Sequence, residues 1–578
     1  MEYVDVLVVG AGPVGLITAL QLAKFGGGVS VRIVEKHEKE TQDAFGRAIT
    51  LFPRTVEMLD QLGLADELLQ NCFACRETVT YNAQGEEVSG RGWSFMNYMK
   101  DTAFDFALVL RQKYQEEIYR NALRKYNVQV ETPVELETAL ADKDGSVGDY
   151  KVTAFLLNHS TGARTTVKCK YLIGCDGGHS SVRRIFNIPF DGSSGEDKWV
   201  RIDGQVKTDI PKPRSYCSIE SPTHGNVLWV GLDHGATRIG YAFTNNRANT
   251  YSKFDEAAAI KEAIAAVKPF NIEFERVDWW TIYTVGQRIA DSFSVHNCVF
   301  LAGDACHTHS SAAAQGVNIG IHDAVNLAWK LSLVLRGLAY PDLLSTYEKE
   351  RRPNVEKLIQ YDRVISLLIN GRTPEKWAHD EGRDANAVLG ELFEKLAAFS
   401  SGLGIAYEVW SDDPLNVHSS HSSENMPLKA GMRGPDITLL RPGTFERTRL
   451  IRELPNVASF SVLVFVTENT PAIPKEVYDA ILDSPIQELT TKGLLKSITI
   501  LPDRAASAYE VLGHDPLGRA FFDDEECNAY RRYNIDRKQG GIVILRPDGW
   551  IGTIIELGAD AASKLNSYFT WKIWKLSA

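Results

Sequence analysis

Short apolar runs that lead directly into glycine recur along the first half of the chain. Val4 to Val9 is rich in valine, which is typical of a parallel strand buried on both faces. Tyr171 to Gly174 and Val299 to Ala302 predict two more such strands. Leu16 to Phe25 instead has apolar residues at helical spacing, and Val29 to Val34 predicts the next strand. The pattern therefore predicts an α/β domain built on a parallel sheet.

The middle of the chain predicts a second, sheet-rich domain over residues 191–285. Val227 to Leu232 and Thr237 to Phe243 are rich in strand formers and flank Asp233-His234-Gly235-Ala236, which predicts a hairpin. Glu273 to Val285 predicts another strand. The α/β domain would then be interrupted, with a first part over 1–190 and a second part over 286–370.

The last third of the chain predicts helices, a looser connection and a third domain. His322 to Arg336 and Tyr347 to Ile369 are helical in pattern, and residues 371–427 form the expected connecting segment. From residue 428 strands and helices alternate. The expected elements are a strand at Phe460 to Thr467, a helix at Lys475 to Leu482, a strand at Leu495 to Leu501, and a hairpin of Gly541 to Asp548 with Trp550 to Ile555.

Composition narrows the class of protein. The net charge of -11 argues against a general nucleic-acid or anionic-membrane surface, so we expect no nucleic-acid and no membrane partner. Eight irregularly spaced cysteines do not suggest a disulfide framework, and a cytoplasmic location is the expectation. The apolar run Val4 to Ala23 contains Asp5 and several glycines, which an export signal or membrane span would not.

The first glycine motif, Gly10-Ala11-Gly12-Pro13-Val14-Gly15, lies between a predicted strand and helix. In such a motif Gly10 permits a tight turn, Gly12 lets the backbone approach a pyrophosphate, and Gly15 lets helix and strand pack closely. Glu35 ends the next strand and is placed to accept hydrogen bonds from a ribose. The alternative is a plain glycine turn with an exposed glutamate; strand, helix and acid together favour a Rossmann-type dinucleotide site.

Two later motifs are candidates for the same ligand. Asp176-Gly177-Gly178-His179-Ser180-Ser181-Val182-Arg183 follows one predicted strand, although Asp176 and Arg183 alone would also fit a surface turn. Asp304 follows another strand, and backbone N–H groups near Gly316 and Val317 are placed to hold the polar edge of a flavin ring.

Together these motifs resemble the class A flavoprotein monooxygenases of the para-hydroxybenzoate hydroxylase fold, and most of all the phenol hydroxylase branch. The likeness covers roughly residues 3 to 365. The residues that carry it are Gly46-Arg47-Ala48, Pro53-Arg54-Thr55, Gln112 with Glu116, Gln287-Arg288, the run from Gly303 to Ser310, Gln315 to Asn318, and Asp323 to Leu331.

The resemblance implies an enzyme that binds FAD, takes electrons from NADPH or NADH as a transient co-substrate, and reacts with O2. A flavin C4a-hydroperoxide would then hydroxylate a phenolic or polyketide-like aromatic. Baeyer–Villiger oxygenation, epoxidation or ring rearrangement are alternatives within the family, and a non-enzymatic flavin-binding protein is a third. The expected FAD residues are Gly10, Gly12, Pro13, Gly15, Glu35, Lys36, Arg47, Ala48, Arg111, Gln112, Asp176, Asp304, Ala314, Gly316, Val317 and Asn318.

For the substrate, the resemblance implies a role for Tyr283, which matches a substrate-side tyrosine of the phenol hydroxylase branch. An aromatic packed at a domain seam is the alternative for Tyr283. Tyr241 and Arg238 are further candidates, for which an ordinary residue of a sheet face is the favoured alternative. The branch can carry an aspartate base near Ile49, which cannot take a proton, so that role moves elsewhere or is absent. The family also often has proline and glycine where this chain has Ser311 and Ala314.

The remaining signals have simpler readings. The third domain resembles the thioredoxin-like C-terminal domain of phenol hydroxylases without a Cys-x-x-Cys, which implies a homodimer contact or an inert extension. Cys72-Phe73-Ala74-Cys75 is a lone pair without partners. His307, His309 and Cys306 lie inside the flavin motif, so no metal site is expected.

Overall fold

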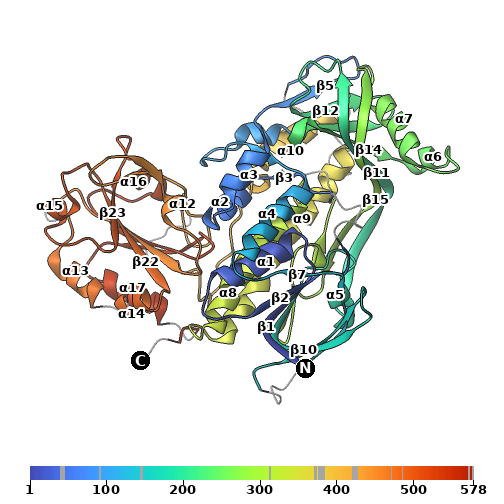
Figure 1. Ribbon diagram of the computed structural model, residues 1–578. Helices are drawn as coiled ribbons and strands as arrows, with labels where there is room; N and C mark the ends of the chain where they lie inside the picture. Colours follow the sequence, from blue (N-terminus) through green and yellow to red (C-terminus); the bar gives the residue numbers. More distant parts are fainter. Residues whose placement is uncertain are drawn as a thin grey trace.

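The computed structural model describes residues 1–38, 46–89, 93–142, 148–310, 314–369, 374, 384–418, 427–469, 472–483, 486–570 and 573–575. Figure 1 shows three regions: a sheet with the N-terminus at the bottom, a second sheet at the top right, and the C-terminal domain at the left. Long helices run through the middle of the molecule between them. Among the described residues, no helix is both long and apolar enough to cross a membrane.

The first sheet has the predicted parallel core. Its strand order is β16-β17-β10-β1-β2-β7, with β16 (Ser294–Val295) and β7 (Val130–Glu131) at the two ends. β1 (Glu2–Val9) lies between β10 (Arg164–Gly174) and β2 (Val31–Val34). β10 also pairs in parallel with β17 (Val299–Leu301). Val9 is paired with Gly174, and Gly174 with Leu301, so the carboxyl ends of β1, β10 and β17 lie side by side.

Helices α1 (Pro13–Lys24), α4 (Gln112–Arg124), α8 (Gly316–Leu335) and α9 (Thr346–Ile369) pack beside this sheet (Figure 1). The expected helix from His322 begins earlier, at Gly316. Gly316 and Gly320 weaken the helical pattern in the sequence, but Gly320 is needed for packing. A Cβ atom at Gly320 would lie 2.7 Å from Val14 of α1, so the missing side chain allows the two helices to approach.

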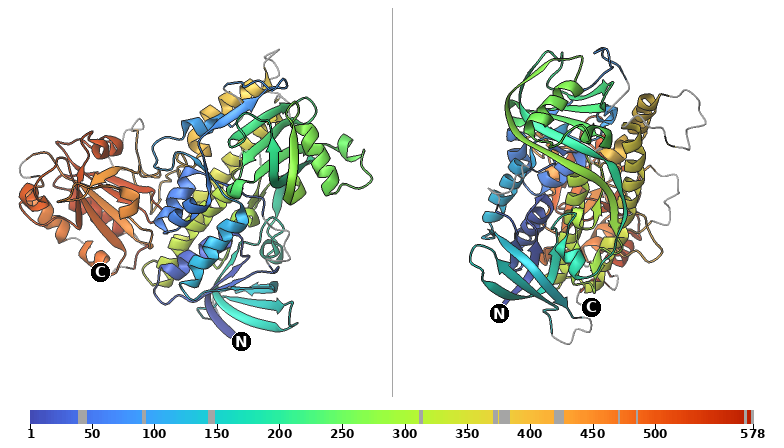
Figure 2. Two further views of the ribbon diagram at one scale, coloured as in Figure 1. Left: turned by 45° about the horizontal axis from the view of Figure 1, so that its top comes forward. Right: turned by 90° about the vertical axis from the view of Figure 1, so that its right-hand side faces the viewer.

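The second sheet contains two 19-residue strands, β11 (Phe190–Thr208) and β15 (Ile272–Ala290). Its order is β18-β15-β11-β14-β13-β12-β5. The expected hairpin is present as β13 (Gly225–Gly231) and β14 (Thr237–Phe243). The other members are β12 (Tyr216–Ser221), β5 (Thr78–Tyr81) and β18 (His307–Thr308). β15 runs across residue 285/286, where we expected the domain boundary, and β5 comes from the first part of the chain. Both views in Figure 2 show the long strands β11 and β15 reaching toward the first sheet.

The two faces of this second sheet bury different clusters, because side chains alternate along a strand. Trp199 faces inward, toward an apolar cluster that also holds Ile49 and Phe393. Val200 and Ile202 face outward, into a cluster shared with α7 (Glu256–Ala266). The inner face is therefore the one that looks toward the flavin motifs.

The C-terminal domain has the predicted alternation of strands and helices. The strands of its sheet lie in the order β20-β19-β23-β22-β21-β24-β25. Their bounds are β19 (Thr438–Leu440), β20 (Arg447–Arg449), β21 (Phe460–Phe465), β22 (Leu495–Leu501), β23 (Arg519–Asp523), β24 (Gly541–Leu545) and β25 (Ile551–Glu556). The expected helix is α13 (Lys475–Leu482). Within residues 384–418, the described part of the expected connecting segment, there are two helices, α10 (Ala385–Lys395) and α11 (Ala397–Ser400).

Candidate FAD and substrate site

The three predicted motifs converge at the carboxyl ends of β1, β10 and β17. A Cβ atom on Gly10 would lie 2.4 Å from the carbonyl oxygen of Cys175, which places the first motif directly against the second. A Cβ atom on Gly303 would lie 2.9 Å from Val14 Cγ2, which places the third motif against the first. Glycine is favoured at both positions because φ is positive at each, and because a Cβ would meet backbone atoms at Gly10 and the Val14 side chain at Gly303.

The first motif has an open space where a pyrophosphate would bind. Gly12 precedes α1, and Pro13 is the first residue of that helix. In the part of the chain that the structure describes, no atom lies within 4 Å of a Cβ built on Gly12. The first N–H groups of a helix have no intrahelical acceptor and favour an anion. Glu35 is half-buried beside this turn: its Oε2 accepts the Ala11 N–H at 2.9 Å and its Oε1 accepts the His37 N–H at 3.1 Å.

The second motif ties the site together. Asp176 accepts hydrogen bonds from the Ser180 hydroxyl and from the Ser181 and Val182 N–H groups at the start of α5 (Ser181–Ile185). Burial raises the pKa of Asp176, although these hydrogen bonds oppose the rise. Arg183 donates to the Ala305 carbonyl at 2.7 Å and so joins the second motif to the third. The carboxylate of Asp176, an expected FAD residue, thus caps the start of α5.

The third motif is stabilised by a buried network of hydrogen bonds around Asp323, which the sequence did not reveal. Asp323 accepts the Gly303 N–H at 3.0 Å, His307 Nε2 at 2.7 Å and Arg351 Nε at 2.7 Å. Burial alone would raise the pKa of Asp323, but Arg351 and His307 outweigh it and lower the pKa to about 2. Asp304 itself is exposed at the end of β17, where it is free to meet a ligand.

The residues before α8 fit the polar edge of a flavin. Ala314 has a φ of +53°, a conformation that favours glycine, while Ser311 lies outside the described residues. The Nε2 atom of His309 is buried, has no hydrogen-bond partner among the described residues, and lies 3.8 Å from a Cβ built on Gly316. An orphaned polar atom beside a helix N-terminus suits a polar group supplied by a ligand. With the open space at Gly12, these residues fit FAD.

Asn318 and Gln112 hold neighbouring backbone with their side chains. Asn318 Oδ1 accepts the Phe52 N–H at 2.8 Å, and its Nδ2 donates to the carbonyls of Thr50 and Ala314. Gln112 Oε1 accepts the Ala48 N–H at 3.2 Å. Asn318 and Val317 would therefore meet FAD through backbone N–H groups, as Gly316 would.

Two expected FAD residues have other partners. Arg111 is buried and pairs with Asp233 and Asp278, both at 2.7 Å, so its guanidinium serves the second sheet and we do not retain it as an FAD contact. Lys36 pairs with Glu135 at 2.7 Å on the surface. The charge of Arg111 looked available in the sequence because both acids lie more than a hundred residues away along the chain.

Tyr283 lies on the inner face of the second sheet, where two arginine side chains contact its ring. The guanidinium of Arg47 is 5.2 Å and that of Arg201 is 5.9 Å from the centre of its ring. Arg201 lies across Gly240, where a Cβ would meet its Nη1 at 2.2 Å. Tyr283 and Ala314 both pack against the inner apolar cluster, so the expected substrate tyrosine and the flavin loop (residues 314–315, before α8) border the same cluster.

Arg238 also lies on the inner face, as a support. It forms a two-pronged ion pair with Asp203, at 2.6 and 2.8 Å, and donates to the Arg47 carbonyl. This geometry makes Arg238 a residue that positions Arg47.

Tyr241 is placed differently from our expectation. It is fully buried on the outer face, and its hydroxyl donates to the Ala259 carbonyl at 2.9 Å. Arg238 and Tyr241 are three residues apart, so the two-residue period of a strand already implied opposite faces. We therefore do not retain Tyr241 as a substrate residue.

Cysteine and histidine near the motifs have local partners. Cys306, His307 and Asp323 come within 4.8 Å of one another, but His307 and Arg351 already bind the Asp323 oxygens. Burial keeps Cys306 a thiol by raising its pKa well above the usual value. Burial likewise raises the pKa of Cys72 and of Cys75 to about 11, so neither is a thiolate at neutral pH.

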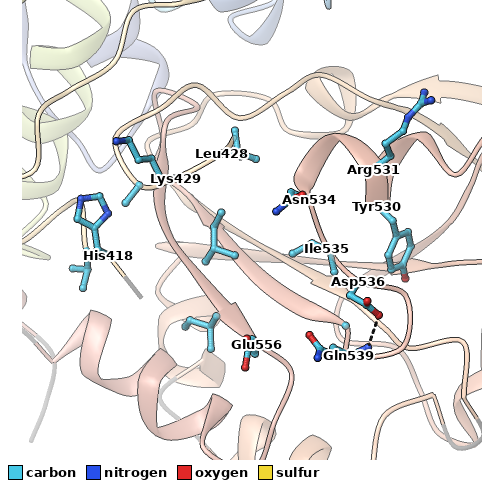
Figure 3. Close-up of a pocket in the computed structure, with 15 residues that line it drawn as sticks. His418, Leu428, Lys429, Tyr530, Arg531, Asn534, Ile535, Asp536, Gln539 and Glu556 are labelled. Carbon is cyan, nitrogen blue, oxygen red and sulfur yellow. Dashed lines mark hydrogen bonds between the residues drawn. The ribbon is translucent and has the colours of Figure 1, made fainter. Parts of the chain in front are cut away.

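A cavity of about 460 Å³ lies in the C-terminal domain, away from the three motifs. Its wall includes His418, Lys429, Asn534 and Glu556 (Figure 3). None of the expected FAD or substrate residues lines it. The cavity therefore does not bear on the flavin chemistry.

Comparison with known proteins agrees with this architecture. Residues 3–362 match the FAD binding domain family, and residues 409–575 match the phenol hydroxylase C-terminal dimerisation domain. A phenol 2-monooxygenase of Aspergillus fumigatus is 29% identical, over 98% of this chain and 96% of that protein. The 3-hydroxybenzoate 4-monooxygenase of Comamonas testosteroni is 28% identical over 98% and 94%.

Solved structures share the fold over the whole chain. Aklavinone-11 hydroxylase, solved with FAD and aklavinone, superposes with a TM-score of 0.72 at 22% identity over 98% of each chain. The anhydrotetracycline hydroxylase from Streptomyces rimosus gives 0.71 at 23% identity over 100% of each. With the converging motifs and the family match, the chain belongs to the FAD-dependent aromatic monooxygenases that carry a phenol hydroxylase C-terminal dimerisation domain.

Proposed function

We propose that this enzyme uses NAD(P)H and O2 to hydroxylate a phenolic or polyketide-like aromatic held on the inner face of the second sheet. The observation that carries the proposal is the shared position of Tyr283 and Ala314 against one apolar cluster. A planar aromatic bound there would touch the sheet on one side and the flavin loop on the other. The relatives named for phenol and for 3-hydroxybenzoate support a phenolic substrate.

Bound FAD supplies the redox chemistry and the activation of oxygen. The chain's own residues bind and orient the ring, exclude water and control the proton of the substrate hydroxyl. We assign Tyr283 to a hydrogen bond with that hydroxyl. Phe52, Trp93 and Trp199, from the same inner cluster, would form the dry surroundings of the ring.

This chain has no acidic side chain at position 49 that could accept the proton of the substrate hydroxyl. Ile49 is 5% exposed within the apolar cluster and cannot accept a proton. The guanidinium groups of Arg47 and Arg201, which both contact the Tyr283 ring, would instead favour the phenolate by lowering the pKa of a phenol bound beside them. A phenolate ring is the more electron-rich acceptor of oxygen.

The test is a screen for phenol-stimulated NADPH oxidation, with the mass of each product determined. Tyr283→Phe should keep FAD bound and reduce coupled hydroxylation by roughly ten- to a hundredfold, the range for losing one hydrogen bond to a charged group. Tyr241→Phe is the matched control, since it removes the same hydroxyl from the outer face. Unchanged turnover and coupling in Tyr283→Phe would remove this residue from the proposal, and a product lacking one added oxygen would reject hydroxylation.

The C-terminal domain supports a further part of the proposal. Its match to a dimerisation domain is the basis for proposing a homodimer through residues 428–578. Light scattering of the purified enzyme tests this directly.

A further inference from the structure

The C-terminal domain contacts the FAD region (residues 3–362) at the turn that joins β24 to β25. We call residues 546–550 the interdomain turn. Its residue Asp548 accepts Trp329 Nε1 of α8 at 3.0 Å, and Arg546 pairs with Glu350 of α9 at 2.5 Å. Both contacts are buried. The two regions also share one hydrophobic core, which runs from Leu16 of α1 to Trp550.

Arg54 contacts the interdomain turn with its guanidinium group. It lies in α2 (Pro53–Gln61) of the FAD region, and its Nη2 donates to the Asp548 carbonyl at 2.6 Å. Its guanidinium stacks on Trp550 at 4.5 Å. Its Nη1 pairs with Glu57 at 2.9 Å, and Glu57 in turn pairs with Arg433 of the C-terminal domain. This pair of ions is enclosed, because the Arg54 side chain is 3% and the Glu57 side chain 0% exposed.

A short chain of hydrogen bonds leads from Arg54 to the flavin loop. The Arg54 N–H donates to the Ser401 carbonyl at 3.2 Å, and the adjacent Ser400 carbonyl accepts Gln315 Nε2 at 2.8 Å. Gln315 is the residue that precedes α8, whose first N–H groups face the cofactor site. The segment before Arg54 is held as well, since Asn318 of α8 accepts the Phe52 N–H.

We propose that Arg54 is a positioning residue for FAD, through which the interdomain turn of the C-terminal domain holds the N-terminus of α8 in place. The C-terminal domain is then part of the cofactor site, whatever its role in a dimer. This inference rests on FAD binding alone and stands or falls separately from the proposed substrate and its hydroxylation.

Gly549 offers a test from the far side of the interface. It has a φ of +81°, and a Cβ there would lie 2.8 Å from Arg54 Nη2. Gly513 is the matched control: it has a φ of +75° in the same domain, and no described residue has an atom within 4 Å of a Cβ built there. Gly549→Ala and Gly513→Ala therefore carry the same backbone strain, but only Gly549→Ala displaces Arg54.

The readouts are the FAD dissociation constant of each apoprotein, from flavin fluorescence, and the oligomeric state from light scattering. Gly549→Ala and Arg54→Met should weaken FAD binding by about fivefold or more, and Gly513→Ala by less than about twofold. Equal FAD affinity in Gly549→Ala, Gly513→Ala and wild type would overturn the proposal. So would a loss of affinity that appears only together with dissociation into monomers, because the effect would then belong to the dimer.

Hydrogen exchange on the wild-type enzyme keeps the proposal testable if the variants fail to fold. By linkage, a turn that helps to bind FAD must itself be stabilised by FAD. FAD should slow exchange at the amides of Gly549 and Trp550 more than at Gly513. Equal protection of the two turns would refute the coupling.

Discussion

Replacing Gly12 by alanine separates the cofactor role of the first motif from its role in folding. Gly12 has φ −73° and ψ −176°, a backbone conformation open to any residue. No atom of the described residues lies within 4 Å of the added Cβ. The apoprotein should therefore tolerate the change, and its free energy of unfolding should stay within about 1 kcal/mol of wild type, with a slight gain from the stiffer unfolded chain.

The neighbouring glycines predict the opposite behaviour. A Cβ on Gly15 would lie 2.0 Å from the Gly10 carbonyl oxygen, and one on Gly10 would lie 2.4 Å from the Cys175 carbonyl oxygen. Backbone atoms on both sides would have to move. Gly15→Ala should therefore destabilise the apoprotein itself, by roughly 2 kcal/mol or more, as expected for forced overpacking.

The expected loss of FAD affinity in Gly12→Ala follows from what the methyl group would displace. It would enter the space before α1 and push the pyrophosphate away from the helix N–H groups. Losing one hydrogen bond to a charged group costs about 1.5–3 kcal/mol. That cost corresponds to a rise of roughly 10- to 150-fold in the dissociation constant.

The assay is an FAD titration of each apoprotein, paired with urea unfolding of the same sample. Gly12→Ala should combine normal stability with weak FAD binding, whereas Gly15→Ala should lose both. If Gly12→Ala bound FAD within about twofold of wild type, the pyrophosphate would not lie at this turn and the assignment of the first motif would be wrong.

Two further predictions concern buried polar groups. Tyr241→Phe removes the hydrogen bond to the Ala259 carbonyl. It should therefore lower the free energy of unfolding in urea by about 1 kcal/mol and leave FAD affinity unchanged. A loss of turnover without a loss of stability would contradict the placement of Tyr241 on the outer face. The pKa of Asp323 is lowered from its usual 3.8 to about 2. Its carboxylate therefore stabilises the fold by roughly 2 kcal/mol above about pH 4, and this contribution is lost as the pH falls toward 2. Asp323→Asn should be less stable than wild type at pH 6, and the difference should shrink toward pH 2; a constant difference would show that the charge of Asp323 is not what stabilises the loop.

Local chemistry made the cofactor motifs visible in the sequence. Strand, glycine turn and helix follow one another from Glu2 to Lys24 without help from the rest of the chain. Glu35 could be placed because it ends the next parallel strand. The same is true of the hairpin β13–β14, whose two strands are joined by a short turn.

The roles of single polar residues were less visible, because their partners are distant in the sequence. Arg111 looked like a ligand for FAD until the fold brought Asp233 and Asp278 to it. Asp323 was part of a family motif, but only packing against α9 showed that Arg351 and His307 hold it. Arg54 and Asp548, which lie 494 residues apart, meet only when two domains dock.

The sequence by itself therefore determined the cofactor, the α/β framework and the family, since these depend on short-range patterns of glycine and apolar residues. Tertiary structure alone decided which face of the second sheet looks at the flavin, and so separated Tyr283 from Tyr241. The physical reason is that a strand's period of two sorts its residues into two faces but does not say which face is inward. That choice is made by the elements that pack on each side: α7 on one face, and the aromatic cluster beside the flavin loop on the other.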